Sequence, residues 1–270
     1  MRPVFYLSDG TGITTETIGH SMLAQFEGIE YNARRIPFVD NLEKAQLAAD
    51  AISAEQALLG KKAIVFTSVV DMQANTIIAS TGALLLDVLT PFALPLENEL
   101  GVSRKPRVGG AHALVNYKAY EERIDATNFA LMHDDGMNYN YANADLIIVG
   151  VSRSGKTPTC LYLALHYGVK AANYPLTDED LQGEGLPKRL QPFKNKLFGL
   201  TIDPVRLQQI RQVRKPNSKY AELAQCKMEV QRAEAIFKSI RLPHVSSTNT
   251  SIEEMASKIL AHLNIQNQHY

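Results

Sequence analysis

The stretch from Leu146 to Thr159 reads LIIVGVSRSGKTPT and matches the phosphate-loop pattern G-x-x-x-x-G-K-[ST] at every fixed position. The run Leu146–Gly150 is continuously apolar, which is typical of a parallel strand buried on both faces. Pro158 suits the first turn of a helix, and Gly168 suits its end. A buried strand, a glycine-containing loop and a helix are therefore expected in succession, which is the context that the pattern requires.

The chemistry of this loop follows from its residue types. Glycines let the backbone wrap around a phosphate, and the positive end of the following helix faces the anion. Lys156 adds a mobile positive charge, and the hydroxyl of Thr157 can ligate Mg²⁺. The sequence therefore predicts a site for nucleotide phosphates. The predicted binding residues are Gly150, Val151, Ser152, Arg153, Ser154, Gly155, Lys156 and Thr157.

Strand-like and helix-like patterns alternate along both halves of the 270-residue chain. This alternation predicts an α/β fold in which helices flank a parallel sheet. We expect an N-terminal α/β domain with a connecting helix over residues 1–140, and a C-terminal P-loop kinase-like domain over residues 141–270. The polar tract Asp134–Asp145 is the expected linker, and Leu94–Gly110 is expected to be an extended connection or a boundary.

The composition excludes several classes of protein. Lys plus Arg and Asp plus Glu both number 28, so the net charge of zero argues against nucleic-acid binding through a general basic field. The two cysteines, Cys160 and Cys226, lack metal-type spacing, and we expect no zinc site, no disulfide and a cytoplasmic location. The N-terminal residues lack a signal-peptide pattern, and no apolar run is long enough to cross a bilayer, so we expect no membrane partner.

Two adjacent carboxylates, Asp134 and Asp135, stand in the stretch Met132–Met137, MHDDGM, at the end of a predicted helix. Negative charge is mildly unfavourable there because the helix dipole is negative at its C-terminus. One interpretation makes them solvated turn residues with Gly136 as the helix cap. The other makes one of them the group that deprotonates an attacking hydroxyl or holds Mg²⁺, with His133 alongside. The spacing alone leaves both open.

Arg211 and Arg214 line the end of a predicted helix that starts at Asp203-Pro204. An aspartate that ends a strand can ligate a metal, but Asp before Pro is typical of a helix cap, which we favour. Arginines in this position act as lid residues in phosphate-loop kinases, where they stabilise charge on the transferred phosphoryl group. The alternative is a solvated basic helix end.

The stretch Ser8–Thr17, SDGTGITTET, follows a predicted strand and opens a helix. Gly10 and Gly12 permit a tight turn, which would make a second anion-binding turn with Asp9 as its polar group. Without other information, an ordinary strand–helix turn with capping hydroxyls is the favoured interpretation.

Several stretches together resemble one family, the bacterial phosphoenolpyruvate synthase regulatory proteins, which are relatives of the pyruvate, phosphate dikinase regulatory proteins. They extend from Phe5 to Leu260, so the resemblance covers nearly the whole chain. The stretches are FYLSDGTGIT, PFVDN, HDDG, GVSRSGKTPT, KAANYPL, LFGLTIDPVRLQQIR, NSKYAELAQCKMEV and SSTNTSIEEMASKIL.

The resemblance implies a bifunctional regulator of phosphoenolpyruvate synthase. It would transfer a phosphoryl group from ADP to a threonine of that enzyme, and remove it with inorganic phosphate, releasing pyrophosphate. Mg²⁺ would be held at Thr157, and Gly150–Thr157 carry over as the nucleotide loop. We also expect a homodimer. The residues that we predict to take part in catalysis are Lys156, Asp134, Asp135, Asp9, Arg211 and Arg214.

Two other functions fit the phosphate loop. The C-terminal half alone resembles a kinase of small molecules, although such kinases rarely carry an N-terminal half of this length. A nucleotide sensor that binds a partner without catalysis would use the loop and leave the aspartates without a role.

Overall fold

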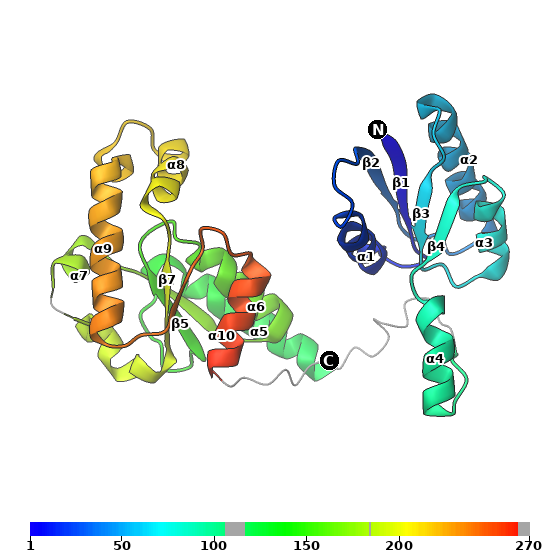
Figure 1. The fold of residues 1–270 in the computed structure, drawn as a ribbon. Coiled ribbons are helices and arrows are strands. Elements are labelled where there is room, and N and C mark those ends of the chain that lie inside the picture. The colour runs from blue at the N-terminus through cyan, green and yellow to red at the C-terminus, as the bar shows by residue number, and fades with distance from the viewer. Residues whose placement is uncertain (106–116, 184, 264–270) are drawn as a thin grey trace. The chain divides into compact units, whose positions relative to one another are not determined.

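The protein has two compact units, Met1–Leu114 and Val115–Tyr270, each built on a four-stranded parallel sheet (Figure 1). The computed structural model describes residues 1–105, 117–183 and 185–263. Helices cover the sheets, which confirms the expected α/β fold. No helix within these described ranges is both long and apolar enough to cross a membrane.

The N-terminal unit has the strand order β2-β1-β3-β4. Side chains of β1 alternate between the two faces, as expected for a strand. Phe5 and Leu7 pack with Ile52 of α2 and Ile78 of α3, whereas Tyr6 packs on the opposite face with Leu23 of α1. The elements are β1 (Arg2–Leu7), α1 (Ile13–Leu23), β2 (Tyr31–Ile36), α2 (Leu42–Leu59), β3 (Ile64–Thr67), α3 (Met72–Ala79), β4 (Leu84–Asp87) and α4 (Thr90–Leu100).

Part of the expected extended connection Leu94–Gly110 is helical, because Leu94 to Leu100 belong to α4. The carboxylate of Asp87 accepts the N–H groups of Leu89 and Thr90 at the start of this helix, and Gly101 ends it in the left-handed conformation. These caps stabilise both ends of the helix and offset the destabilising effect of Pro95, which lies inside it. The portion of the predicted connection from 106 onward lies outside the described residues.

The C-terminal unit has the strand order β6-β5-β7-β8, and β5 is buried throughout. Helices α5, α6 and α10 cover one face of this sheet, and α8 and α9 cover the other (Figure 1). The elements are α5 (Tyr117–Met132), η1 (Asp134–Gly136), β5 (Leu146–Gly150), α6 (Lys156–Tyr167), β6 (Ala171–Pro175), α7 (Asp178–Gln182), η2 (Lys188–Lys196), β7 (Leu197–Thr201), α8 (Pro204–Arg214), η3 (Lys219–Ala221), α9 (Leu223–Ser239), β8 (His244–Ser246) and α10 (Ile252–Leu263).

The boundary between the units lies before α5, whereas the sequence placed it at residue 140. Ala126 and Ala130 of α5 share a core with Ile148 of β5, so this helix is part of the C-terminal unit. The tract Asp134–Asp145 is not a linker, because Tyr141 within it is fully buried in the other core of the same unit. The amphipathic sequence of α5 predicts that one face of the helix is buried, but it does not indicate which of the two sheets this face packs on.

The phosphate loop follows β5, which lies between β6 and β7. The chain leaves β5 toward β6 on one side and later returns to β7 on the other. In open parallel sheets, ligands bind outside the carboxyl end of the strand where the order switches in this way. The topology therefore places the loop at the expected ligand position of its unit.

Candidate active site

The loop between β5 and α6 has the tight backbone that its sequence predicts. Arg153 and Gly155 have φ angles of 72° and 95°, and Gly155 caps α6. Gly150 is required for packing, since a Cβ at this position would lie 2.3 Å from the carbonyl oxygen of Leu200. The first N–H groups of α6 have no partners within the helix, so they are available to an anion at this end.

Lys156 is only 3 % exposed and donates from Nζ to the carbonyl oxygen of Val151 at 2.9 Å. Burial lowers the pKa of its ammonium from 10.5 to about 8, although the nearby carboxylates of Asp135 and Asp134 oppose that shift. This ammonium is buried and donates to a carbonyl oxygen, so the negative charge of an added anion would stabilise it. Lys156 is therefore a buried cation in the lining of the cavity that could hold a phosphate group.

Thr157, Asp134 and Asn173 form one hydrogen-bonded cluster. The hydroxyl of Thr157 donates to Oδ1 of Asp134 at 2.6 Å. Nδ2 of Asn173 donates to Oγ1 of Thr157 at 2.9 Å and also to Oδ1 of Asp134. Three segments of the chain, the α5–β5 connection, α6 and β6, thus meet at the start of the phosphate-loop helix.

Asp135 has a different environment from its neighbour. It is exposed, lines the cavity above the loop, and has the unusual φ and ψ angles of 45° and 34°. Left-handed backbone is uncommon outside glycine, though Asp and Asn tolerate it best, and such outliers gather at functional sites. The sequence spacing did not distinguish the roles of Asp134 and Asp135. In the structure, Asp134 is hydrogen-bonded to Thr157 and Asn173, whereas Asp135 lines the cavity.

His133 anchors the turn that carries both carboxylates. It is buried, its ring stacks on Phe129, and its Nδ1 and Nε2 lie 2.8 and 3.0 Å from the carbonyl oxygens of Phe129 and Asn140. These contacts hold the ends of the turn together. His133 therefore supports the site and does not line its cavity.

The cavity above the loop has a volume of about 180 Å³. It combines a carboxylate, a buried ammonium and the first turn of a helix. Its lining residues are Asp135, Ser152, Arg153, Gly155, Lys156, Thr157 and Pro158.

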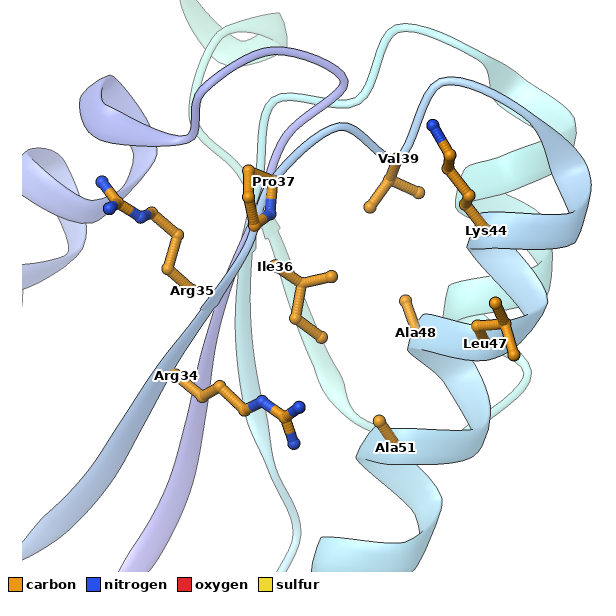
Figure 2. Close-up of a pocket in the computed structure, with 9 residues that line it drawn as sticks. All are labelled: Arg34, Arg35, Ile36, Pro37, Val39, Lys44, Leu47, Ala48 and Ala51. Atoms are coloured by element: carbon orange, nitrogen blue, oxygen red, sulfur yellow. The ribbon is translucent and has the colours of Figure 1, made fainter.

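A larger cavity of about 350 Å³ lies in the N-terminal unit, between the edge strand β2 and helix α2, and Figure 2 shows the residues that line it. Two of its cations are already paired, Arg35 with Glu16 and Lys44 with Asp40. Its lining contains no carboxylate that could accept a proton, so we assign the candidate active site to the smaller cavity. The lining residues are Arg34, Arg35, Ile36, Pro37, Val39, Lys44, Leu47, Ala48 and Ala51.

Arg211 contacts the backbone of the loop and does not line the cavity, whereas a lid arginine would. It is fully buried, forms a bidentate ion pair with Glu229 at 2.6 and 3.1 Å, and donates to the carbonyl oxygens of Ser152 and Tyr220. The sequence interpretation of Arg211 as a residue that closes over the phosphoryl group does not match this position. Arg214 is exposed at the end of α8 and does not line the cavity, so its lid role stays a prediction.

Asp203 and Asp9, for which the sequence suggested roles, do not line the cavity, and neither does Cys160. Asp203 caps α8 by accepting the N–H groups of Val205 and Arg206, which confirms the favoured interpretation. Cys160 is a buried packing residue whose pKa is raised by burial. Asp9 belongs to the N-terminal unit, where its Oδ2 accepts the N–H of Val70 at 3.0 Å, so a catalytic role for it stays a prediction.

The oxygen atoms at the start of α6 fit a hard divalent cation. Mg²⁺ takes oxygen ligands and is commonly held by one or two protein groups together with substrate phosphates. Thr157 and Asp134 offer a hydroxyl and a carboxylate within 2.6 Å of each other. Over the described ranges, no group of three or more His, Cys, Asp or Glu side chains could hold a metal. The hydroxyl of Thr157 and the carboxylate of Asp134 are the side-chain oxygen atoms that could hold such a cation together with the phosphates of a ligand.

Three residues of this region were not predicted from the sequence. Glu229 and Tyr220 hold Arg211, but nothing in their local sequence links them to the loop. Asn173 had a usable signal, because it is a single amide in the otherwise apolar and buried strand β6. A buried amide without partners is costly, so its presence in such a strand indicates a specific hydrogen-bonding role.

Comparison with known proteins identifies relatives over the full chain. A curated protein of Stenotrophomonas maltophilia, named as a candidate phosphoenolpyruvate synthase regulatory protein, is 58% identical over 270 residues, which cover 100% of this chain and 99% of the relative. A protein of the same name from Xanthomonas oryzae pv. oryzae is 56% identical over 268 residues, covering 99% and 98% of the two chains. A solute-binding protein of Actinobacillus succinogenes of known structure aligns at 10% identity with a TM-score of 0.22, which is too low to inform the fold.

A family model described as kinase/pyrophosphorylase matches residues 4–260, which include the phosphate loop and both carboxylates of the acidic turn Asp134–Gly136. The chain therefore belongs to the kinase/pyrophosphorylase family, together with its relatives named as phosphoenolpyruvate synthase regulatory proteins.

Proposed function

We propose that this protein regulates phosphoenolpyruvate synthase by transferring a phosphoryl group from ADP to a threonine of that enzyme, and by removing it with inorganic phosphate. The names of the relatives support the target, and the family description supports a kinase and a pyrophosphorylase direction. The observation that carries the proposal is the cavity that Asp135 lines together with Lys156 and the rest of the first turn of α6.

In the kinase direction, the loop amides and Lys156 hold the phosphates of ADP. Asp135 accepts the proton of the threonine hydroxyl, whose oxygen forms the new bond to the β-phosphorus. The bond from that phosphorus to the bridging oxygen breaks, and AMP leaves with the bridging oxygen. Because phosphoryl transfer depends mostly on positioning and charge neutralisation, this small set of groups is sufficient.

Thr157 and Asp134 would hold Mg²⁺ beside the phosphates, where the cation neutralises negative charge. Arg211 keeps the loop in place through the carbonyl oxygen of Ser152. In the reverse direction, an oxygen of inorganic phosphate attacks the phosphothreonine phosphorus. The threonine oxygen leaves and takes up a proton, and pyrophosphate is the second product.

The proposal is tested by incubating the protein with phosphoenolpyruvate synthase, Mg²⁺ and ADP labelled in its β-phosphate. Label is expected on one threonine of the synthase, with AMP formed in equal amount, and inorganic phosphate should release the label as pyrophosphate. Lys156→Met should abolish labelling. Lys258→Met, which removes an exposed lysine paired with Glu254, is the matched control and should label normally.

Other outcomes would identify other functions. Labelling from the γ-phosphate of ATP but not from ADP would overturn the donor assignment. Turnover of a small metabolite with no label on the synthase would favour a small-molecule kinase. Nucleotide binding without any transfer, unchanged by Asp135→Asn, would favour a sensor.

A further inference from the structure

Asn173 stands in a position that a packing role does not explain. It is 1 % exposed in β6, and its neighbours Ala172 and Tyr174 are buried in the apolar core on the other face of the sheet. An amide buried in such a strand costs about 1–3 kcal/mol when its hydrogen bonds are not made. Its contacts should therefore indicate why an amide is present.

Every described contact of Asn173 outside the sheet leads to the candidate active site. Its backbone N–H donates to the carbonyl oxygen of His133 at 3.2 Å, which ties the acidic turn to the strand. Its Nδ2 donates to Asp134 and to Thr157. Its Oδ1 is buried and has no hydrogen-bond partner among the described residues. The amide is thus oriented by the two acceptors that need its protons, since an ionised carboxylate can only accept.

The hydrogen bonds of the Thr157 hydroxyl can be assigned one by one. A hydroxyl has one proton and two lone pairs. The proton goes to Asp134, and one lone pair accepts from Asn173. One lone pair is left for a further partner, and the hydroxyl cannot rotate without breaking both bonds.

We propose that Asn173 is a positioning residue that orients the Thr157 hydroxyl and the Asp134 carboxylate for a divalent cation bound with the nucleotide. This inference rests on the proposed function, because it assumes that a nucleotide and Mg²⁺ bind at this loop. Asn173 acts through its two partners. Residues that orient metal ligands typically contribute about 10–100-fold to metal affinity.

The test measures the coupling between Mg²⁺ and ADP. Calorimetry gives the dissociation constant of ADP in EDTA and in saturating Mg²⁺, and the ratio of the two constants is the coupling. Asn173→Leu keeps the branching at Cγ and the number of side-chain heavy atoms but removes both N–H donors. We expect its coupling ratio to fall by about tenfold or more, with the dissociation constant in EDTA within about twofold of the wild type.

Tyr174→Phe is the matched control. It removes the hydrogen bond from the neighbouring side chain of β6 to Asp180 at 3.0 Å, on the opposite face of the sheet. This variant should lose stability but keep the wild-type coupling ratio. If Asn173→Leu does not fold, Asn173→Ser is measured in the same way and decides the question.

An unchanged coupling ratio in a folded Asn173 variant would overturn the inference, as would an equal loss of affinity with and without Mg²⁺. ADP binding by the wild type with no coupling to Mg²⁺ would also overturn it and leave the nucleotide site intact. Absence of ADP binding by the wild type under any condition would instead reject the proposed function, and this inference with it.

Discussion

The buried ammonium of Lys156 should make the stability of the nucleotide-free protein depend on pH in a defined way. Folding lowers the pKa of this group from 10.5 to about 8, chiefly through burial. Between these values the unfolded chain carries a proton on Lys156 that the folded chain has released. The free energy of unfolding therefore rises with pH in this interval, and the full destabilisation by the buried charge is present below about pH 8.

The magnitude follows from the two pKa values. Each pH unit between them corresponds to about 1.4 kcal/mol, so the charged lysine destabilises the folded state by about 3 kcal/mol at pH 7. Lys156→Met replaces it with an uncharged side chain of similar length. The variant also loses the hydrogen bond to Val151, which costs about 1 kcal/mol at every pH. The free energy of unfolding of the variant should exceed that of the wild type, and this difference should shrink by about 2 kcal/mol from pH 8 to 9.5.

Urea unfolding of both proteins, followed by circular dichroism from pH 7 to 9.5 at constant ionic strength, measures this difference. Other titrating groups cancel because they are common to both chains. Lys258→Met, at an exposed ion pair, should differ from the wild type by the same small amount at every pH. A difference between Lys156→Met and the wild type that stays constant within about 0.5 kcal/mol over the whole range would refute the reasoning.

Three further results are expected. Asp135→Asn should lower kcat for transfer to the synthase by about 10²–10⁴-fold, with the dissociation constant of ADP little changed in calorimetry, because only the proton acceptor is lost. Arg211→Ala should lower the free energy of unfolding in urea by about 3–5 kcal/mol, since it leaves Glu229 buried without its partner. The affinity for ADP should weaken above about pH 8, approaching tenfold per pH unit, because binding then requires Lys156 to take up a proton; a flat calorimetric profile from pH 7 to 9 would contradict this.

The phosphate loop could be predicted from sequence because its determinants are local. The apolar strand, the glycines that allow the tight turn, and the helix cap lie within one continuous stretch. The cap at Asp203 was predictable for the same reason, since its carboxylate accepts the N–H groups of Val205 and Arg206, two and three residues further on. Where backbone conformation and short-range hydrogen bonds decide a feature, the sequence pattern was sufficient.

The position of Arg211 could not be predicted, because it depends on a partner distant in sequence. Its helical spacing and basic neighbours are typical of an exposed lid helix. The structure buries it through Glu229 of α9, which supplies two carboxylate oxygens, and through Tyr220, whose ring lies 4.0 Å from the guanidinium. Burial raises the free-energy cost of this charge, but Glu229 offsets it and raises the pKa of Arg211 above its usual value.

The acidic turn shows how two identical neighbours can take different roles. Asp134 is held by Thr157 and Asn173 at the start of α6, whereas the left-handed backbone at Asp135 turns the chain so that this carboxylate lines the cavity. Asn tolerates left-handed backbone about as well as Asp. Asp135→Asn therefore removes the charge and keeps the turn, so a loss of kcat in that variant reports on the carboxylate itself. At Asp134 the same substitution would disturb the orientation of Thr157, and its effect should depend on Mg²⁺. The difference between the two variants thus separates proton transfer from metal positioning within one turn.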